Sequence, residues 1–457
     1  MQSTRQSALQ YAQDHQVQFL QDLQEILRIP SISTAVENKN DMQKTASWIA
    51  AQMNALDLIN VQIFQTPGHP VVFGEYRSEV AGAKTVLVYG HYDVQPPEPL
   101  ELWKSEPFIP TVRGDNLYAR GASDMKGQVM ASLKAFESVI RQGPLPLNVK
   151  FMIEGEEEIG SPNLAAFMEQ HADLLACDFA LNPDAGMIAP DIPTIVTGLR
   201  GLAYFEVRFN GPERDLHSGS FGGVVHNPAQ ALCEFIASLH DEKGHVTLPG
   251  FYDSVDLMTE EQHQHVARLP ITAEKLRSQT GVPELWGEPE YTPVERLGFR
   301  PTLEVNGFLS GFTGVGSKTV IPATAMAKIS MRLVPNQDPM EIHRSLLEYL
   351  SEKVPATIRW ELITLGGSPA CRTDSHHPAA ESLAQAMQTV WGVLPAYKNE
   401  GGSVPVVGDM QRILHADSVL TGFGLPDDAI HAPNEKLHLP TWYKGINALI
   451  HFFYNLI

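Results

Sequence analysis

The sequence predicts an α/β protein in which a mostly parallel sheet with flanking helices is interrupted by a smaller, inserted α+β domain. Three observations predict this architecture. Short apolar runs alternate with helical patterns in the first part of the chain, apolar and polar residues alternate in the middle, and the first pattern returns near the end. We therefore predict one domain formed by 1–198 and 368–457, and an inserted domain formed by 199–367.

The first part has the rhythm of strand, helix and strand that is typical of parallel sheets. Residues 41–56 place apolar side chains on one helical face, and 128–140 also read as a helix. The runs at 85–89 and 148–153 are short and apolar, as buried strands are, and 178–181 fits a third strand.

The middle of the chain has a different pattern. Apolar and polar residues alternate at 205–209 and again at 327–333, which predicts strands of a sheet with one exposed face. Asn227 is suited to cap a helix, and a second helix is expected at 339–350. The stretch 244–293 is rich in proline, glycine and charge, and we expect it to be a long irregular insertion.

The first pattern returns after about residue 369. A helix is expected near 381–390, a strand at 418–421 and an apolar helix after Thr441. One α/β domain split by an insert is the simplest topology that fits.

Composition narrows the class of function. The 457 residues carry a formal net charge of -20, which argues against nucleic acid as a partner, because phosphate binding needs clustered Lys and Arg. The three cysteines, Cys177, Cys233 and Cys371, form no C-x-x-C pair and indicate a reducing compartment, so we expect a cytoplasmic protein. Neither a signal peptide nor a membrane span is expected from the apolar runs.

Five short segments place acids and histidines in unusual settings. His91 and Asp93 follow a predicted strand, and Asp124 stands between two glycines before a helix. An acidic run at 154–158 and Asp184 follow two further strands, and His431 follows the last one. Each segment alone would suit a capped turn or a solvated loop. Together they point to one site, because ligands bind at the carboxyl ends of strands in such sheets.

Mixed histidine and carboxylate ligands suit zinc, with cobalt or manganese as substitutes. Two ions held close together need a shared carboxylate ligand. Such a pair can polarise a carbonyl and supply hydroxide at neutral pH.

The motifs that surround these residues resemble those of the M20 family of metallopeptidases. They are GHYDVQP, RGASDMKG, EGEEEIGS, GLRGLAYFEV, DLHSG, SKTVIP, MRLVPN, EGGSVPV and HAPNEKL, and they extend through nearly the whole chain. Within the family the chain looks most similar to cytosolic non-specific and carnosine-type dipeptidases. The resemblance implies a zinc-exopeptidase-like catalytic domain with an inserted lid and dimerisation domain. It also implies a homodimer that hydrolyses short peptides.

The resemblance assigns metal ligands residue by residue. His91 and Asp184 would bind one ion, Glu158 and His431 the other, and Asp124 would bridge the two ions.

The same resemblance assigns the catalytic residues. Asp93 would orient His91, and Glu157 would be the general base that takes a proton from a metal-bridging water. The Ile-Gly-Ser that follows fixes this register and leaves Glu156 as an extra acid. We expect Glu156 to raise the local negative charge or to point to solvent.

The inserted domain also carries expected roles. His217 resembles a histidine that reaches a neighbouring subunit's site and stabilises the oxyanion, and Arg332 one that grips a substrate carboxylate. Asn227 is expected to be structural. The resemblance suggests further substrate contacts at Thr319, Gly401, Gly402 and Ser403. For His217 and Arg332 to reach the ions the lid must close, so open and closed states are expected.

Two other functions remain open at this point. An N-acyl-amino-acid deacylase, of the acetylornithine or succinyl-diaminopimelate type, would use the same metal residues. A metal-binding protein without catalysis is the second alternative, although such a protein would have no chemical need of Glu157.

Overall fold

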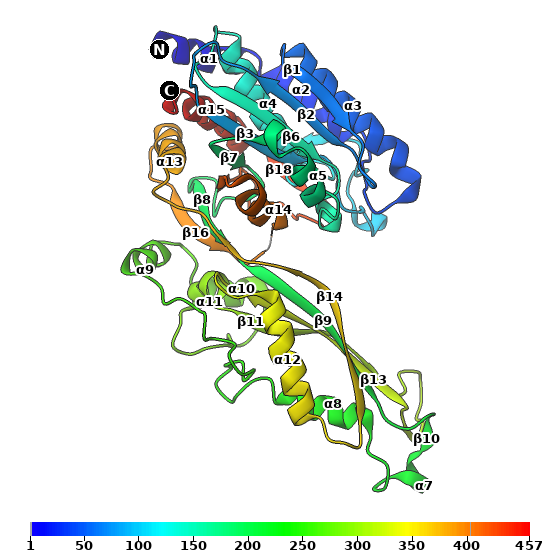
Figure 1. Cartoon of the computed structure of the whole chain (residues 1–457). Helices are drawn as coiled ribbons and strands as arrows, with labels where there is room; N and C mark the ends of the chain where they lie inside the picture. The colour runs from blue at the N-terminus through cyan, green and yellow to red at the C-terminus, as the bar shows by residue number, and fades with distance from the viewer. Residues whose placement is uncertain (1, 403) are drawn as a thin grey trace. The chain divides into compact units, whose positions relative to one another are not determined.

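The computed structural model describes residues 2–402 and 404–457, which form two compact units (Figure 1). Unit 1 contains the chain up to Thr197 together with Thr373–Lys398 and Pro405–Ile457. Unit 2 contains Gly198–Arg372 and the short segment Asn399–Val404. The sequence placed the boundaries at 198/199 and 367/368, and it did not separate 399–404 from the catalytic domain.

Unit 1 is built on a nine-stranded sheet whose four central strands, β6, β3, β7 and β17, are parallel to one another. The strands beside this centre, β2 and β8, run antiparallel to it. The α/β class expected from the sequence is therefore confirmed. In sheet order, with β16 pairing to β8, the strands are β1 (Ile59–Phe64), β2 (Val71–Tyr76), β6 (Asn148–Glu154), β3 (Thr85–His91), β7 (Phe179–Asn182), β17 (Asp417–Thr421), β8 (Thr194–Leu199), β15 (Cys371–Arg372) and β16 (Ala396–Glu400).

Helices pack on both faces of this sheet. Successive residues of a strand point to opposite faces. Phe151 of β6 packs against Phe136 of α4, whereas Lys150 donates a hydrogen bond to the carbonyl of Ala176, just after α6. One layer contains α1 (Gln2–Asp14), α2 (Gln16–Leu27), α4 (Lys126–Ile140), α13 (Pro378–Trp391) and α15 (Leu439–Asn455). A second group of helices that pack together contains α5 (Leu164–Gln170), α6 (Ala172–Leu175) and α14 (Pro405–Asp409). Helix α3 (Lys39–Ala55) packs against β1 and β2.

The buried core of unit 1 lies between the sheet and the helices α4 and α15. Gly90 of β3 allows the close approach of α4, because a Cβ there would lie 2.6 Å from a methyl carbon of Val129. Close packing at this point fixes the strand end that carries His91. A separate three-stranded sheet of β4 (Thr111–Arg113), β5 (Asn116–Tyr118) and β18 (Lys436–His438) completes the unit.

Unit 2 contains a four-stranded antiparallel sheet with α8 and α12 on one face. Every second residue of the long strands is buried beneath these helices, as the sequence pattern predicts. The residues between them are mainly polar and lie on the opposite face of the sheet. In sheet order the strands are β11 (Thr302–Ser310), β13 (Thr324–Leu333), β9 (Gly201–Asn210) and β14 (Arg359–Ser368), and the helices are α8 (Pro228–Ala237) and α12 (Pro339–Lys353).

The expectation that 244–293 is irregular is wrong in part. This stretch contains α9 (Glu260–Ala267) and α10 (Ala273–Thr280), and α11 (Pro293–Phe299) begins at its end. Thr259, which precedes α9, forms a capping box with Gln262, and Thr272 caps α10. Val266 is the one buried residue of α9 and α10 has none, so these helices lack the apolar stripe by which helices are usually predicted.

Among the described residues, no helix combines the length and the apolar character that crossing a bilayer requires.

Candidate active site

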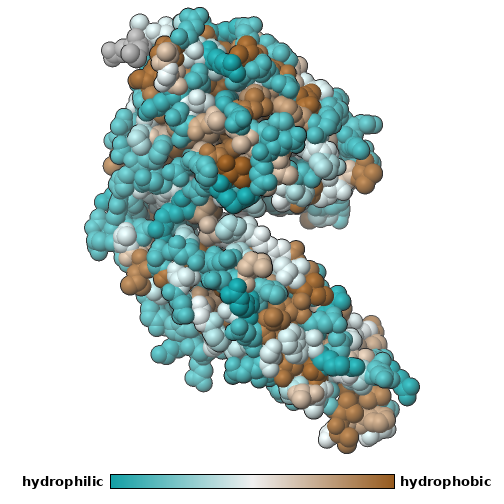
Figure 2. Space-filling model, viewed as in Figure 1, coloured by the Kyte–Doolittle hydropathy of each residue, from teal (hydrophilic) through white to brown (hydrophobic). Residues whose placement is uncertain are grey.

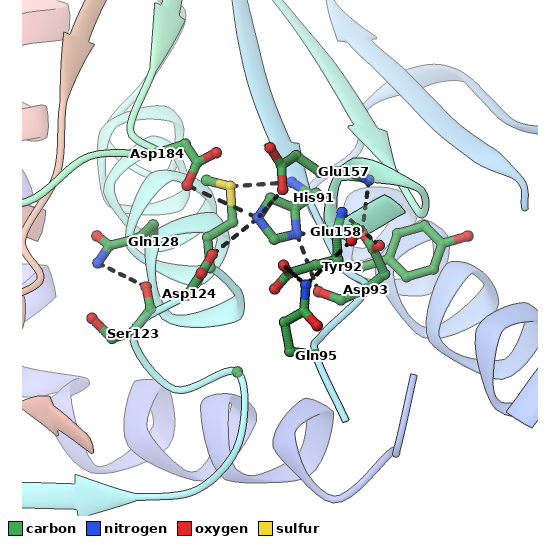
Figure 3. A network of polar contacts seen from close by, with 12 residues as sticks. His91, Tyr92, Asp93, Gln95, Ser123, Asp124, Gln128, Glu157, Glu158 and Asp184 are labelled. Carbon is green, nitrogen blue, oxygen red and sulfur yellow. Dashed lines mark hydrogen bonds and ion pairs between the residues drawn. The ribbon is translucent and has the colours of Figure 1, made fainter. Parts of the chain in front are cut away.

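His91 ends β3, and its side chain is completely buried. Its Nδ1 lies 3.1 Å from the carbonyl oxygen of Asp93 and 3.3 Å from the carboxylate of the same residue. Its Nε2 faces a group of acids and lies 3.2 Å from Oδ1 of Asp124 (Figure 3). Contacts at Nδ1 thus fix the ring so that Nε2 is presented to the acids.

Asp124 lies between the two histidines of the site. Its Oδ1 is 3.2 Å from Nε2 of His91, and its Oδ2 is 2.8 Å from Nε2 of His431. The same nitrogen of His431 is 3.2 Å from Oε2 of Glu158. Each oxygen of Asp124 therefore faces a different histidine, which is the arrangement that a bridging carboxylate needs.

Glu157 and Asp184 complete the cluster and face the same Nε2 of His91. Oε2 of Glu157 lies 4.0 Å from Nε2 of His91, and Oδ1 of Asp184 lies 3.9 Å from it. Within the part of the chain that the structure describes, two groups of three residues offer atoms that all lie within 4.8 Å of one another and can hold an ion. These groups are His91, Asp124 and Glu158, and His91, Glu157 and Asp184.

The acids of the cluster repel one another in a buried place. Burial, reinforced by the neighbouring carboxylates, raises the pKa of Glu157 to about 9 and that of Asp184 to about 7. Hydrogen bonds to Asp124 and Glu158 raise the pKa of His431 to about 10. Ionised carboxylates at such a density are costly without cations. The donor set of two histidines and several carboxylates therefore fits a pair of divalent ions.

Asp93 has a second contact that the sequence did not indicate. Its Oδ1 accepts a hydrogen bond from the backbone N–H of Glu157 at 3.2 Å, and its Oδ2 accepts one from that of Glu158 at 3.0 Å. Asp93 therefore fixes the turn that presents both acids in addition to orienting His91.

Glu435 is a structural member of the site that sequence reasoning missed. It is buried and accepts hydrogen bonds from Nη1 of Arg120 at 2.7 Å and from the backbone N–H groups of Gly121, Ser123 and Asp124 at 2.9 to 3.1 Å. It thus holds the loop that carries Asp124. The motif HAPNE contains Glu435, but its burial was not readable from the sequence.

The expectation that Glu156 points to solvent is wrong. Its side chain is buried and accepts hydrogen bonds from the backbone N–H of His69 at 3.0 Å and from Nδ2 of Asn163 at 2.9 Å. Glu156 therefore ties two loops of unit 1 together.

Arg332 lies in unit 2, near the end of β13, and it lines a cavity of about 400 Å³ together with Arg200. The Nε of Arg200 donates a hydrogen bond to the carbonyl of Gly401 at 3.2 Å. A Cβ at Gly401 would lie 2.9 Å from Nη2 of Arg200, so glycine permits this close approach. Gly402 is exposed, and Ser403 lies outside the described residues.

His217 and Thr319 are neighbours in another part of unit 2. The two-residue strands β10 (Leu216–His217) and β12 (Val320–Ile321) pair with each other, and the Ser218 N–H donates to the carbonyl of Thr319 at 3.1 Å. His217 is exposed, and its Nδ1 accepts a hydrogen bond from the Gly219 N–H at 3.0 Å.

The two groups of predicted substrate residues lie at opposite ends of the sheet of unit 2 (Figure 1). Thr319 comes just before β13 begins at Thr324, whereas Arg332 is the second-last residue of this ten-residue strand. A strand of ten residues is about 30 Å long. His217 and Arg332 of one chain are therefore too far apart to contact the same dipeptide.

Apolar residues are exposed around the end of unit 2 where α7 (Ser218–Phe221) lies (Figure 2). They include Phe221 and Val224, and further apolar side chains of the edge strand β11 are exposed. Asn227, as expected, caps α8 by accepting a hydrogen bond from the Ala229 N–H.

Comparison of this chain with known sequences and structures identifies the family to which it belongs. The model of peptidase family M20/M25/M40 matches residues 87–455. The Beta-Ala-His dipeptidase of Homo sapiens is 31% identical over 97% of this chain and 91% of its own length. The Cys-Gly metallodipeptidase DUG1 of Candida albicans is 30% identical over 95% and 94%.

The crystal structure of the M20 family metallo-carboxypeptidase Sso-CP2 from Sulfolobus solfataricus is also similar. It has 36% sequence identity and a TM-score of 0.85, and the match covers 96% of this chain and 99% of that one. The match extends over both units, in agreement with the resemblance carried by the sequence motifs. The chain belongs to the peptidase family M20/M25/M40 and is a hydrolase.

Proposed function

We propose that the protein hydrolyses the peptide bond of dipeptides, or of very short peptides, that have a free C-terminal carboxylate. The observation that carries this proposal is the cluster of two histidines and four acids, which are His91, His431, Asp124, Glu157, Glu158 and Asp184. The names of the relatives agree with it, because the human relative is a Beta-Ala-His dipeptidase and the Candida relative a Cys-Gly dipeptidase.

Two divalent ions would be held by this cluster, most simply zinc, with cobalt or manganese as substitutes. His91 and Asp184 would bind one ion, Glu158 and His431 the other, and Asp124 both. When bound, such ions polarise the scissile carbonyl and make water a nucleophile at neutral pH.

Glu157 is the general base in this proposal. Its backbone is fixed by Asp93, and its carboxylate lies within 4.0 Å of the His91 ring, next to the proposed ligands. It removes a proton from the attacking water and then delivers this proton to the leaving amine.

Arg332 and the backbone at Gly401 and Gly402 hold the free carboxylate of the substrate. The guanidinium of Arg332 can bind a carboxylate through two parallel hydrogen bonds. Arg200 supports this assignment, since it lines the same cavity as Arg332 and is hydrogen-bonded to Gly401.

The active protein is a homodimer in this proposal, and His217 and Thr319 act in the site of the partner subunit. The distance of about 30 Å between the two ends of β13 supports this role, because one chain cannot use both groups on one dipeptide. The exposed apolar residues beside His217 and on β11 are suited to bury themselves against a second copy. The three cysteines are free, as expected for the cytoplasm, where we place the protein.

Metal depletion and reconstitution test the proposal. The chelated protein receives zinc, cobalt or manganese and is assayed with dipeptides and with N-acetyl and N-succinyl amino acids. We expect metal-dependent cleavage of dipeptides. Cleavage of the acylated amino acids alone would assign the protein to the deacylases. Two bound ions without turnover of any substrate would contradict catalysis.

A further inference from the structure

The cavity of about 400 Å³ in unit 2 has the dimensions of a small-molecule site, for which about 300–1,000 Å³ is typical. Its floor is formed by residues of β11 and β13, including Ser330 and Arg332. Its wall comes from the inserted segment, with Tyr252 and Trp286 as the large side chains. The segment 244–293 therefore forms a wall of a pocket beside Arg332, the arginine that is expected to bind a carboxylate.

The lining of this pocket is positively charged, although the whole chain is strongly acidic with a formal charge of -20. His240 also lines the pocket, and burial lowers its pKa, so it stays neutral at pH 7. The lining has a net charge of +2, from Arg200, Arg296, Arg300 and Arg332 against Glu288 and Glu304.

Two of these arginines form interactions that stabilise the wall of the cavity. Arg300 binds both oxygens of Glu288, at 2.7 and 2.8 Å, and its guanidinium lies over the ring of Tyr252. Arg296 donates hydrogen bonds to the carbonyls of Tyr291 at 2.9 Å and Trp286 at 3.1 Å. The charge of Arg300 is thus neutralised by Glu288, whereas Arg296 adds its charge to the pocket while it holds the wall in place.

The other two arginines, Arg200 and Arg332, line the cavity together. Nη1 of Arg200 donates to the carbonyls of Arg296 and Arg300, which fixes its position. Burial, followed by repulsion from Arg332, lowers the pKa of Arg200 to about 10, and Glu304 opposes this effect only in part. Like charges held together in a cavity favour the binding of an anion, which relieves their repulsion.

We infer that this cavity receives the C-terminal residue of the substrate and selects an acidic side chain, aspartate or glutamate, at that position. The inference rests on the proposed function, in which Arg332 takes the α-carboxylate. One carboxylate neutralises only part of the excess charge of +2, so a second carboxylate on the side chain is favoured and an ammonium group is repelled. The expected order of preference is acidic, then neutral, then basic.

A pair of substrates of equal shape tests the selection. Alanyl-glutamate and alanyl-glutamine differ in charge but hardly in size, so the ratio of their kcat/KM values measures the charge preference of the metal-loaded, full-length protein. We expect a ratio of about tenfold or more in favour of glutamate, equivalent to about 1.4 kcal/mol. A ratio of one or below would overturn the inference and leave the dipeptidase activity intact.

The variant Glu304→Gln tests whether this cavity is where the acidic side chain binds, because the direction of its effect on the preference is predicted. Glu304 is exposed at the cavity, so the variant is expected to fold, and it removes a negative charge that opposes the ligand. The ratio of kcat/KM for alanyl-glutamate to kcat/KM for alanyl-glutamine should rise about threefold or more, because charges still interact appreciably at the effective dielectric constant of such sites. Glu361→Gln is the matched control, since Glu361 is exposed on β14 and does not line the cavity. An equal rise in both variants would contradict selection by this cavity.

Binding of free amino acids separates this inference from the proposed function. Calorimetry of the metal-loaded protein with glutamate and with glutamine needs no turnover. If glutamate binds more tightly and Glu304→Gln strengthens its binding, the cavity selects dicarboxylates even where no dipeptide is hydrolysed. If the two amino acids bind equally, the selection is wrong, whatever the enzyme cleaves.

Discussion

The two units of this protein concentrate charges of opposite sign. In unit 1, Glu157, Glu158 and Asp184 follow parallel strands of the sheet, and they gather around His91 together with Asp124, which comes just before α4. In unit 2, the antiparallel sheet and the insert enclose a cavity whose arginines outnumber its acids. A short peptide has a carbonyl that suits cations and a carboxylate that suits arginine. In the proposed function, unit 1 would therefore carry out the chemistry and unit 2 would bind the carboxylate of the substrate.

The largest expected effect comes from the proposed general base in unit 1. Glu157→Gln keeps the shape of the side chain but cannot accept the proton, so kcat should fall about 10³-fold, within the range for acid–base catalysis. Metal content, measured by mass spectrometry of the native protein, should remain near two ions per chain.

Glu156→Gln is the matched control for this variant, since Glu156 is the adjacent acid and accepts its hydrogen bonds from His69 and Asn163. We expect its turnover to stay within about threefold of the wild type. Near-normal activity of Glu157→Gln would show that the base is assigned to the wrong residue.

Metal removal should distinguish the two units by their stability. Ions bound at 1,000 times their Kd stabilise the native state by about 4 kcal/mol. Chelation should therefore speed amide hydrogen exchange in the loops at Asp124 and Glu157, where the acids repel one another, and leave β9 and β13 unchanged. Equal loss of protection in β9 and β13 would contradict the assignment of both ions to unit 1.

The carboxylate contact proposed for Arg332 in unit 2 should affect binding more than chemistry. Arg332→Lys keeps the charge but loses the bidentate geometry, so KM for a dipeptide should rise about tenfold, equivalent to about 1.4 kcal/mol, with kcat less affected. Arg208→Lys is the control, since Arg208 lies on the same sheet and pairs with Glu206. A fall in kcat without a change in KM would show that Arg332 does not contribute to binding of the substrate in the ground state.

The smallest expected effect concerns the helix cap at Asn227. Asn227→Ala removes the hydrogen bond to the Ala229 N–H and should lower the stability of unit 2 by about 1 kcal/mol, measured by urea unfolding. Metal content and the kcat/KM ratio of alanyl-glutamate to alanyl-glutamine should not change. A loss of metal would indicate that Asn227 has a role outside its helix.

The sequence by itself determined the α/β class and indicated which residues form the candidate site. β3 and β6 are mainly apolar in their centres, His91 is the last residue of β3, and Glu157 and Glu158 come just after β6. Because the carboxyl ends of parallel strands meet at one edge of a sheet, local order in the sequence was enough to predict that His91, Glu157 and Asp184 lie together.

Only the tertiary structure decided the contacts between distant segments. Glu435 and Asp124 are 311 positions apart, and Arg200 and Gly401 are 201 apart, so no local pattern relates them. The helices α9 and α10 depend on caps and lack an apolar stripe, and the charge of the cavity arises from residues spread between Arg200 and Arg332. Patterns of hydrophobicity record which face of an element is buried, whereas the partners of a buried charge are chosen when the chain folds.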